Sequence, residues 1–146
     1  MKFPVIFVLT LLLSISCKQL KTVENKNAAG KLIEKYSYKI IEGKELKEGL
    51  YEKYDEEGRL LESANYTNGK LNGIRKLYRE GKLESEETRV DDKYEGPFKA
   101  YHPNGSLQIE ANYTNDIMAG DVKVYYPGGQ LKEIVRFADN VEDGPF

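Results

Sequence analysis

Hydrophobic and polar residues alternate along several short stretches of the chain. In the clearest stretch, residues 107–113, every second side chain is apolar: Leu107, Ile109, Ala111 and Tyr113. A period of two residues is typical of a β-strand that packs one face and leaves the other in water. Residues 60–66 and 131–137 repeat this pattern with one polar exception each. The alternation therefore predicts several short strands that share one packed face.

The stretch 83–89 keeps the spacing but loses the apolar residues. Its four alternate positions hold one apolar and three polar side chains: Leu83, Ser85, Glu87 and Arg89. Because the apolar face is lost, we expect this strand to be locally solvated or shifted in register.

Glycines divide the chain at a nearly constant interval. An opening glycine recurs with spacings of 24, 23, 24 and 24 residues, at Gly49, Gly73, Gly96, Gly120 and Gly144. The first four copies continue with a tyrosine, a second glycine and a leucine: Tyr54, Gly58 and Leu60; Tyr78, Gly81 and Leu83; Tyr101, Gly105 and Leu107; Tyr125, Gly129 and Leu131. Such a period indicates a tandem repeat array. Repeat arrays present surfaces more often than they build pockets.

Each unit reads as two strands joined by tight turns. The first strand runs from the opening glycine to the tyrosine, as in 49–54, and the second begins near the leucine. The second glycine is expected to take a positive φ, and Asn68-Gly69 is a strong hairpin signal. Connections this short cannot hold parallel crossovers. We therefore predict an all-β fold, an elongated single-layer antiparallel meander.

Two further expectations follow from the spacing of the copies. The tyrosines in the equivalent slot should stack as a row across neighbouring units: Tyr54, Tyr78, Tyr101 and Tyr125. Gly30-Lys31-Leu32 matches the back half of an earlier unit, and an insertion of about four residues at 42–45 should form a longer loop there.

The first 29 residues lie outside the repeats. Residues 1–16 read as an export signal, because Lys2 precedes an apolar run of 13 residues, 3–15. That run is shorter than the roughly 20 residues of a membrane-spanning helix. Residues 17–29 are polar and without periodicity, so we expect a disordered tether. The repeat array then occupies residues 30–146.

Cys17 is the only cysteine and ends the apolar run. Ser14-Ile15-Ser16-Cys17 resembles the bacterial lipobox, although Ser14 stands where the pattern usually has leucine. The resemblance implies cleavage before Cys17 and transfer of diacylglycerol to its thiol. The protein would then be anchored by lipid in the bacterial cell envelope, at the outer membrane or the periplasmic face. The alternative is an ordinary signal peptide with an incidental cysteine.

Charge and residue types argue against catalysis and nucleic-acid binding. The formal net charge is −2 and both signs are mixed along the chain, so no basic stripe offers itself to nucleic acid. His102, the only histidine, lies in a Pro-Asn-Gly turn without a fixed nucleophile or carboxylate beside it in the sequence. The acidic residues have no calcium-loop spacing. We expect no enzymatic activity, cofactor, metal or small-molecule substrate.

Residues 95–107 resemble a MORN repeat in its bacterial variant form, which reads Gly-x-aromatic-x-x-Tyr, a turn and Gly-x-Leu. The other copies match, except that Arg75 and Val122 take the aromatic position. The resemblance implies an elongated antiparallel sheet without enzymatic activity that contacts proteins or membrane surfaces. Many bacterial relatives are labelled as antitoxins of toxin–antitoxin pairs.

Two kinds of function remain open at this point. The first is an anchored interaction module that binds a protein or an envelope component, with an antitoxin or immunity protein as a special case. The second is an envelope enzyme or accessory subunit, such as that of a hydrolase. Gly144-Pro145-Phe146 matches the opening strand of a fifth unit, which is either a short cap or a truncated copy.

Overall fold

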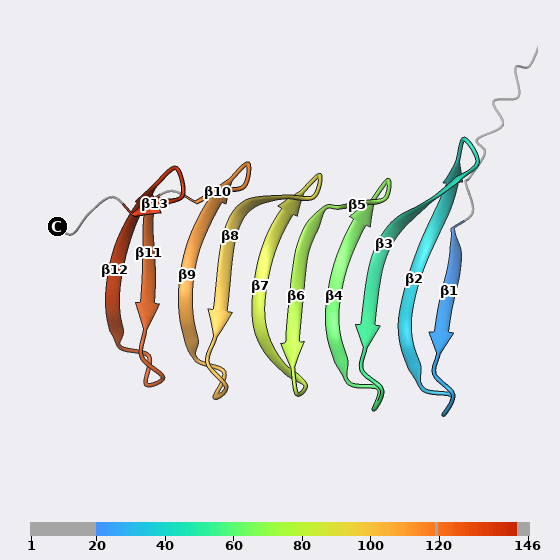
Figure 1. Ribbon diagram of the computed structural model, residues 1–146, viewed down its shortest axis with the longest axis horizontal. Coiled ribbons are helices and arrows are strands. Elements are labelled where there is room, and N and C mark those ends of the chain that lie inside the picture. Colours follow the sequence, from blue (N-terminus) through green and yellow to red (C-terminus); the bar gives the residue numbers. More distant parts are fainter. Residues whose placement is uncertain (1–19, 119, 143–146) are drawn as a thin grey trace, which may run out of the picture.

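The computed structural model describes residues 20–118 and 120–142, and the regular structure within them is entirely β (Figure 1). The strands are β1 (Lys21–Lys26), β2 (Leu32–Ile41), β3 (Lys44–Tyr54), β4 (Leu60–Thr67), β5 (Lys70–Leu71), β6 (Gly73–Arg79), β7 (Lys82–Val90), β8 (Lys93–Tyr101), β9 (Leu107–Thr114), β10 (Ile117–Met118), β11 (Gly120–Tyr125), β12 (Leu131–Ala138) and β13 (Val141–Glu142). The predicted export signal, Cys17 and Gly144 lie outside the described residues.

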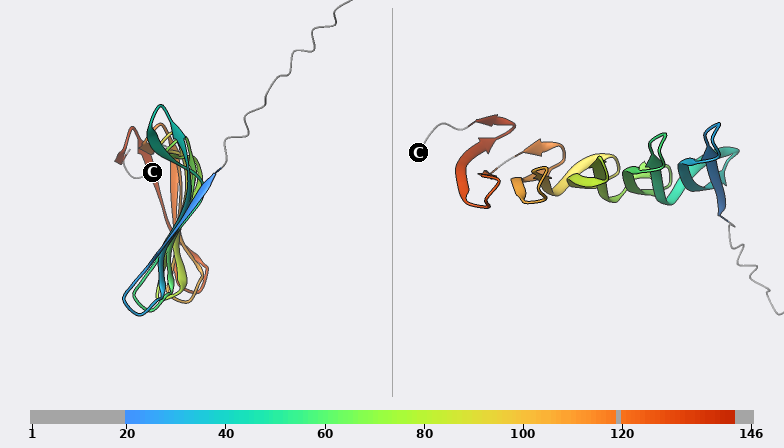
Figure 2. Two further views of the ribbon diagram at one scale, coloured as in Figure 1. Left: turned by 90° about the vertical axis from the view of Figure 1, so that its right-hand side faces the viewer. Right: turned by 90° about the horizontal axis from the view of Figure 1, so that it is seen from below.

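All of these strands belong to one antiparallel sheet. The order β1-β2-β3-β4-β6-β7-β8-β9-β11-β12-β13 follows the sequence, with β5 on β4 and β10 on β9. Figure 2 shows that the sheet is a single twisted layer with both faces uncovered. The predicted elongated single-layer meander is confirmed.

The core of the sheet is small because only one face is partly packed. Four hydrophobic residues are buried: Tyr51, Ala64, Ala111 and Val122. Residues directly opposite on paired strands point to the same side, so the pairs Tyr51–Ala64 and Phe98–Ala111 place these residues together. We call this side the aromatic face. The opposite side carries alternating charges and is called the charged face.

The predicted row of repeat tyrosines is wrong. The ring pairs among the described residues join other aromatic residues, namely Tyr36, Tyr38, Tyr51 and Tyr66 in one group and Tyr94, Phe98 and Tyr113 in the other. Tyr101 instead lies on the charged face. The pairing of β8 with β9 shifts register between Ala100 and Tyr101. The Tyr101 hydroxyl donates to Glu86 Oε1 at 2.7 Å.

The expectation for residues 83–89 is wrong in one part, because this face is buried and not solvated, although the pairing with β8 does shift register between Glu87 and Arg89. β7 is a continuous strand of nine residues, and Glu87 is only 3% exposed on the aromatic face. Arg75 Nη1 lies 3.2 Å and Arg89 Nη2 lies 2.7 Å from Glu87 Oε1, and Arg75 Nε lies 2.6 Å from Glu62 Oε1. Because Arg75 occupies the position that is aromatic in other units, ion pairs replace the missing apolar contacts.

The predicted turn geometry is confirmed. The second glycines of the four units have φ values of 84°, 75°, 86° and 86°, at Gly58, Gly81, Gly105 and Gly129. Asn68 and Gly69 both have positive φ, as a tight two-residue hairpin requires. The insertion at 42–45 forms no long loop. It lengthens the β2–β3 hairpin, in which Ile41 pairs with Lys44 and only Glu42 and Gly43 turn.

The prediction of a disordered tether over 17–29 is wrong for residues 21–26, which form β1. Thr22, Val23 and Glu24 pair with Ser37, Tyr36 and Lys35 of β2. Asn27 then closes the turn by accepting hydrogen bonds from the backbone of Ala29 and Lys31. The segment forms a strand without the glycine and tyrosine that mark the other units, so its composition concealed it.

The turns at the upper edge of the sheet in Figure 1 form hydrogen bonds that connect each unit to the one before it. The backbone N–H groups of Asp92, Asp116 and Asn140 donate to the carbonyls of Leu71, Tyr94 and Met118. The side chains of the same three turn residues accept hydrogen bonds of 2.8, 2.7 and 2.6 Å from the N–H groups of those same partners. Each turn therefore forms two hydrogen bonds with one residue of the preceding unit. We call this pair of hydrogen bonds the turn clasp.

Candidate functional site

A row of alternating charges crosses the charged face from strand to strand. The register opposes each member to the next, in the order Glu24, Lys35, Glu52, Ser63, Lys76, Glu86, Lys99, Glu110 and Lys123. The Nζ–Oε distances are 2.9 Å for Lys35–Glu24, 4.0 Å for Lys76–Glu86 and 3.9 Å for Lys123–Glu110. Because the signs alternate, this charge ladder leaves the face without an excess of either charge.

A second row on the charged face is apolar. Leu50, Ile74 and Pro97 each follow an opening glycine and stand two residues before a member of the ladder. The exposed fractions of Leu50 and Ile74 are 52% and 50%. One strand lies between successive members, so two strand spacings separate their side chains, which project at intervals of about 10 Å. We call these three residues the aliphatic row.

The aliphatic row is bordered by small polar residues and a hollow. Leu50 pairs with Asn65, Ile74 with Thr88 and Pro97 with Asn112. A hollow of about 200 Å³ lies between Ile74 and Pro97 and is lined by Thr88 and Lys99 as well. The surface thus offers apolar anchors, a depression between two of them and a balanced set of charges beside them.

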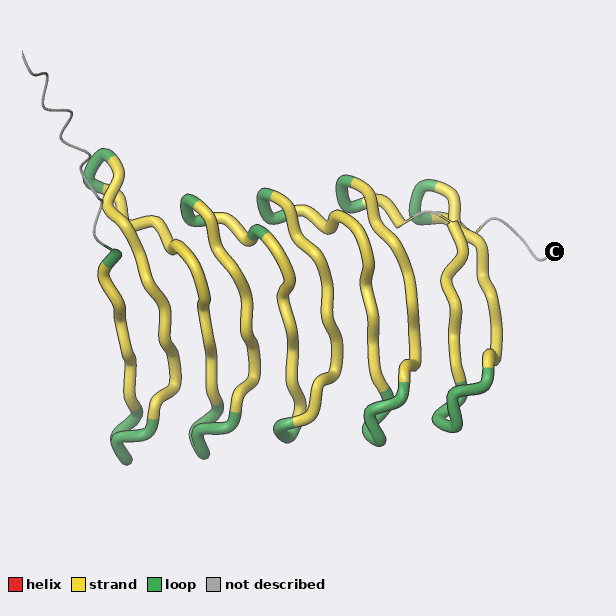
Figure 3. Tube along the Cα trace, turned by 180° about the vertical axis from the view of Figure 1, so that it is seen from behind, coloured by secondary structure: helices red, strands yellow, loops and turns green. Residues whose placement is uncertain are grey.

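A groove lies at the lower edge of the sheet in Figure 1, beside the β6–β7 turn, because this turn is shorter than the others at that edge. Residues 27–31, 55–59, 102–106 and 126–130 connect strands in the other units, whereas only Glu80 and Gly81 connect β6 to β7. Figure 3 shows this small turn among its larger neighbours. The space of about 280 Å³ beside it is lined on one side by Arg79 and Leu83.

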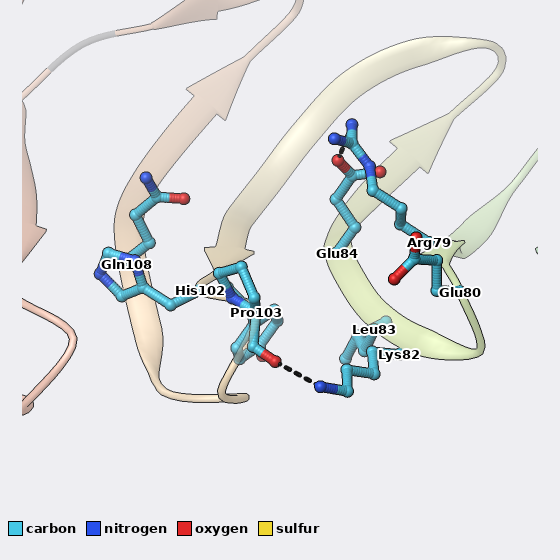
Figure 4. Close-up of a pocket in the computed structure, with 9 residues that line it drawn as sticks. Arg79, Glu80, Lys82, Leu83, Glu84, His102, Pro103 and Gln108 are labelled. Carbon is cyan, nitrogen blue, oxygen red and sulfur yellow. Dashed lines mark hydrogen bonds and ion pairs between the residues drawn. The ribbon is translucent and has the colours of Figure 1, made fainter.

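The opposite side of this groove holds His102 and Gln108 (Figure 4). Lys82 Nζ donates to the carbonyl of Pro103 at 2.9 Å and bridges the two turns, and Arg79 is paired with Glu84. His102 Nε2 contacts the carbonyl oxygen of Tyr125 at 2.9 Å, so it joins neighbouring units. The groove mixes polar and apolar side chains, and Arg79 and Lys82 in its lining are already bound to groups of this chain.

Two tyrosines have strongly altered acidity. Burial, followed by the Glu34 carboxylate, raises the pKa of Tyr51 to about 12. Burial and the hydrogen bond to Glu86 raise the pKa of Tyr101 to about 12. Both phenols therefore stay protonated far above neutral pH, and each serves as a neutral donor or ring surface.

The repeat-defining residues predicted from the sequence shape the turns and strand ends but do not form the candidate surface. The aliphatic row was missed, although its signal was available: an apolar residue follows Gly49, Gly73 and Gly96 but not Gly120. The turn clasp was missed as well, although an Asn or Asp stands eight residues after each repeat leucine, because the residues of the clasp stand one place further on.

Residues 20–118 and 120–142 include no helix that is long and apolar enough to cross a membrane. Within the same part of the chain, no three His, Cys, Asp or Glu side chains are grouped so that they could hold a metal ion.

The fold and the surface define a tandem β-repeat protein. Three segments, residues 47–68, 94–115 and 118–139, match the family model of the MORN repeat variant. The unit with the buried ion pairs, which opens at Gly73, falls outside these matches. These three segments are therefore similar to MORN repeats of the variant form. A comparison with curated proteins finds no significant match.

Proposed function

We propose that this protein is a membrane-anchored, non-enzymatic repeat protein that binds another protein through its charged face. The aliphatic row is the observation that supports this proposal. Leu50 and Ile74 are about half exposed on the charged face, and the residues paired with the row are Asn65, Thr88 and Asn112. Repeated apolar residues on an open surface are typical of interaction sites, and proteins with MORN repeats often bind proteins or membranes.

The chemistry of the face favours a polypeptide partner with apolar groups about 10 Å apart, since two strand spacings separate the members of the row. The charge ladder favours neither an acidic nor a basic partner. Each charged residue of the ladder already has an opposite charge on a neighbouring strand, so covering the face leaves few charges without a counter-charge. A strongly anionic partner such as nucleic acid gains little from this surface.

Site-specific crosslinking in the native envelope tests the proposal. A photo-reactive residue placed at position 76 should capture a discrete partner, and Leu50→Ser combined with Ile74→Ser should abolish the capture. Leu131→Ser is the matched control, because Leu131 is 50% exposed but lies at the start of β12, away from the row. Equal capture by the control and the double variant would contradict the proposal.

The captured protein also separates the alternatives. A toxin encoded beside this protein would identify it as an antitoxin or immunity protein, and an envelope hydrolase would identify it as an accessory subunit. The non-enzymatic part of the proposal is tested by His102→Ala. Because His102 Nε2 contacts only a backbone carbonyl, at Tyr125, this variant should keep its fold and its biological activity.

A further inference from the structure

Three tyrosine rings on the aromatic face surround the ammonium group of Lys47. Tyr36 of β2, Tyr51 of β3 and Tyr66 of β4 lie on three adjacent strands, and their centroids are 6.5 Å apart for Tyr36–Tyr51 and 5.7 Å for Tyr51–Tyr66. Lys47 Nζ lies 4.8, 4.0 and 5.3 Å from the ring centroids of Tyr36, Tyr51 and Tyr66. All three distances are within the range of cation–π attraction. We call these three residues the tyrosine cage.

A carboxylate completes the surroundings of this ammonium group. Glu34 Oε1 lies 3.9 Å from Lys47 Nζ. Glu34 Oε2 accepts a hydrogen bond of 2.7 Å from Asn25 Nδ2, which holds the carboxylate in place. Several aromatic faces with one nearby carboxylate form the combination that recognises ammonium ions of low hydration.

Lys47 is not a fixed part of the repeat architecture. The equivalent positions, two residues before the other opening glycines, hold Leu71, Tyr94 and Met118. The 3.9 Å separation from Glu34 is too long for a hydrogen bond, and the side chain is 33% exposed. Tyr51, by contrast, is only 8% exposed and fixes the floor of the cage. The cage is therefore well fixed by packing, whereas the Lys47 side chain is held in it only loosely.

A quaternary ammonium group suits this cage better than Lys47 does. A primary ammonium is strongly hydrated and loses much of that hydration against the rings. A quaternary ammonium has the same charge, presents methyl groups to the rings and loses little hydration. We infer that the tyrosine cage is a binding site for quaternary ammonium groups, and that Lys47 occupies it until such a group displaces it.

NMR titration of the full chain in detergent with tetramethylammonium chloride tests the inference. In the free protein, ring currents should shift the Lys47 ε-methylene signals upfield, and the salt should return them toward ordinary values. Lys47→Ala should bind the ion about tenfold more tightly than the unaltered chain, a ratio typical of one cation–π contact. Lys44→Ala is the matched control, because Lys44 is an exposed lysine of the same strand and pairs with Ile41, away from the cage and from Glu34.

Two results would overturn the inference. One is a normal position for the Lys47 ε-methylene signals in the free protein. The other is equal affinity of the folded Lys47→Ala and Lys44→Ala variants for tetramethylammonium. Binding should disappear in Lys47→Ala combined with Tyr51→Leu, which tests whether the cage is the site. Phosphocholine and Nε-trimethyllysine amide are then compared as competitors of tetramethylammonium. Stronger competition by phosphocholine indicates a lipid headgroup as the ligand, and stronger competition by Nε-trimethyllysine amide indicates a modified side chain.

Discussion

At the scale of single residues, alternation along the strand and the register shifts near the turns decide which tyrosines pack and which lie on the charged face. The spacing of Tyr54, Tyr78, Tyr101 and Tyr125 was visible in the sequence, but their face was not. The register shifts between Lys53 and Tyr54 and between Ala100 and Tyr101 interrupt the pairing just before the turn. A bulge cannot be located from apolar periodicity, because it depends on how the turn closes. The opening-glycine spacing therefore predicted the strands but not the aromatic clusters.

The raised pKa values of Tyr51 and Tyr101 predict a loss of stability at alkaline pH. Each pKa is about 12 in the folded chain against an ordinary value of 10. Because the folded pKa is the higher one, the contribution of the neutral phenol is complete below pH 10 and is lost as the pH rises toward 12. Urea titrations from pH 8 upward should show this loss, on the order of 2 kcal/mol for Tyr51.

Tyr101→Phe is the control for this alkaline effect, because it keeps the ring and removes the ionising hydroxyl that donates to Glu86. In this variant, the free energy of unfolding should depend less on alkaline pH, and the remaining dependence should be the part that comes from Tyr51. Titration of all eleven tyrosines together near the ordinary value, followed by the absorbance of tyrosinate in the folded chain, would contradict the prediction.

The turn clasp predicts different effects for two substitutions of Asp116. Asp116 has a φ of 68° and accepts from the Tyr94 N–H at 2.7 Å. Asp116→Gly keeps the φ without strain and loses only this hydrogen bond, which should cost about 1 kcal/mol. Asp116→Ala also forces a residue with a Cβ into positive φ, so its total cost should be about 2 kcal/mol.

Urea unfolding of both Asp116 variants measures these costs. Gly69 supports the expectation for glycine, because it makes the same backbone contact to the carbonyl of Lys47 without a side chain. Equal stability of Asp116→Gly and the unaltered chain would show that the side-chain half of the clasp contributes nothing.

At the scale of the elements, the tight turns and most of the strands could be predicted because each copy repeats the same chemistry. Two strands could not. β1 has Lys26 and Val23 where other first strands have tyrosine or another large residue, and it forms because β2 offers an edge to pair with. β7 has only Leu83 as an apolar residue at the alternate positions 83–89, and Arg75 and Arg89 hold it through ion pairs with Glu87. In both cases tertiary pairing overrides local composition.

The ion-pair cluster predicts that partial and complete replacement have opposite effects. Arg75→Phe alone removes one partner each of Glu62 and Glu87, and since Glu87 is only 3% exposed, stability should fall by about 2–4 kcal/mol. The triple variant Arg75→Phe, Glu87→Ala and Arg89→Tyr copies the third unit, where Phe98, Ala111 and Tyr113 occupy these positions. It should be as stable as the unaltered chain or up to about 2 kcal/mol more stable.

Thermal and urea unfolding of the single and triple variants measure this difference. Lys76→Phe provides a control on β6, since Lys76 is exposed on the charged face at 4.0 Å from Glu86 and should cost much less than Arg75→Phe. A triple variant that is less stable than Arg75→Phe would contradict the prediction, because it would show that the ion pairs stabilise the sheet more than the apolar residues of the third unit do.

At the scale of the whole molecule, the sheet is a one-dimensional array in which each unit contacts only its neighbours. Stability in such arrays is a sum of units and interfaces, and the turn clasps and paired strands are those interfaces. β1 extends this array toward the predicted anchor. With β1 beginning at Lys21, the path from Cys17 to the sheet spans at most about 14 Å. Lipidation of Cys17 would therefore hold the sheet close to the membrane surface.

The anchor itself is tested by Cys17→Ala. The expected modification adds two acyl chains through the thiol, and two chains suffice for stable membrane attachment. The alanine variant should therefore move from the membrane fraction to the soluble fraction and should incorporate no labelled palmitate. Ser14→Leu is the matched control, because it brings the segment closer to the lipobox and should keep or increase labelling. If the alanine variant still sediments with membranes, and the unaltered chain takes up no palmitate, Cys17 is an incidental cysteine and the protein reaches its partner by another route.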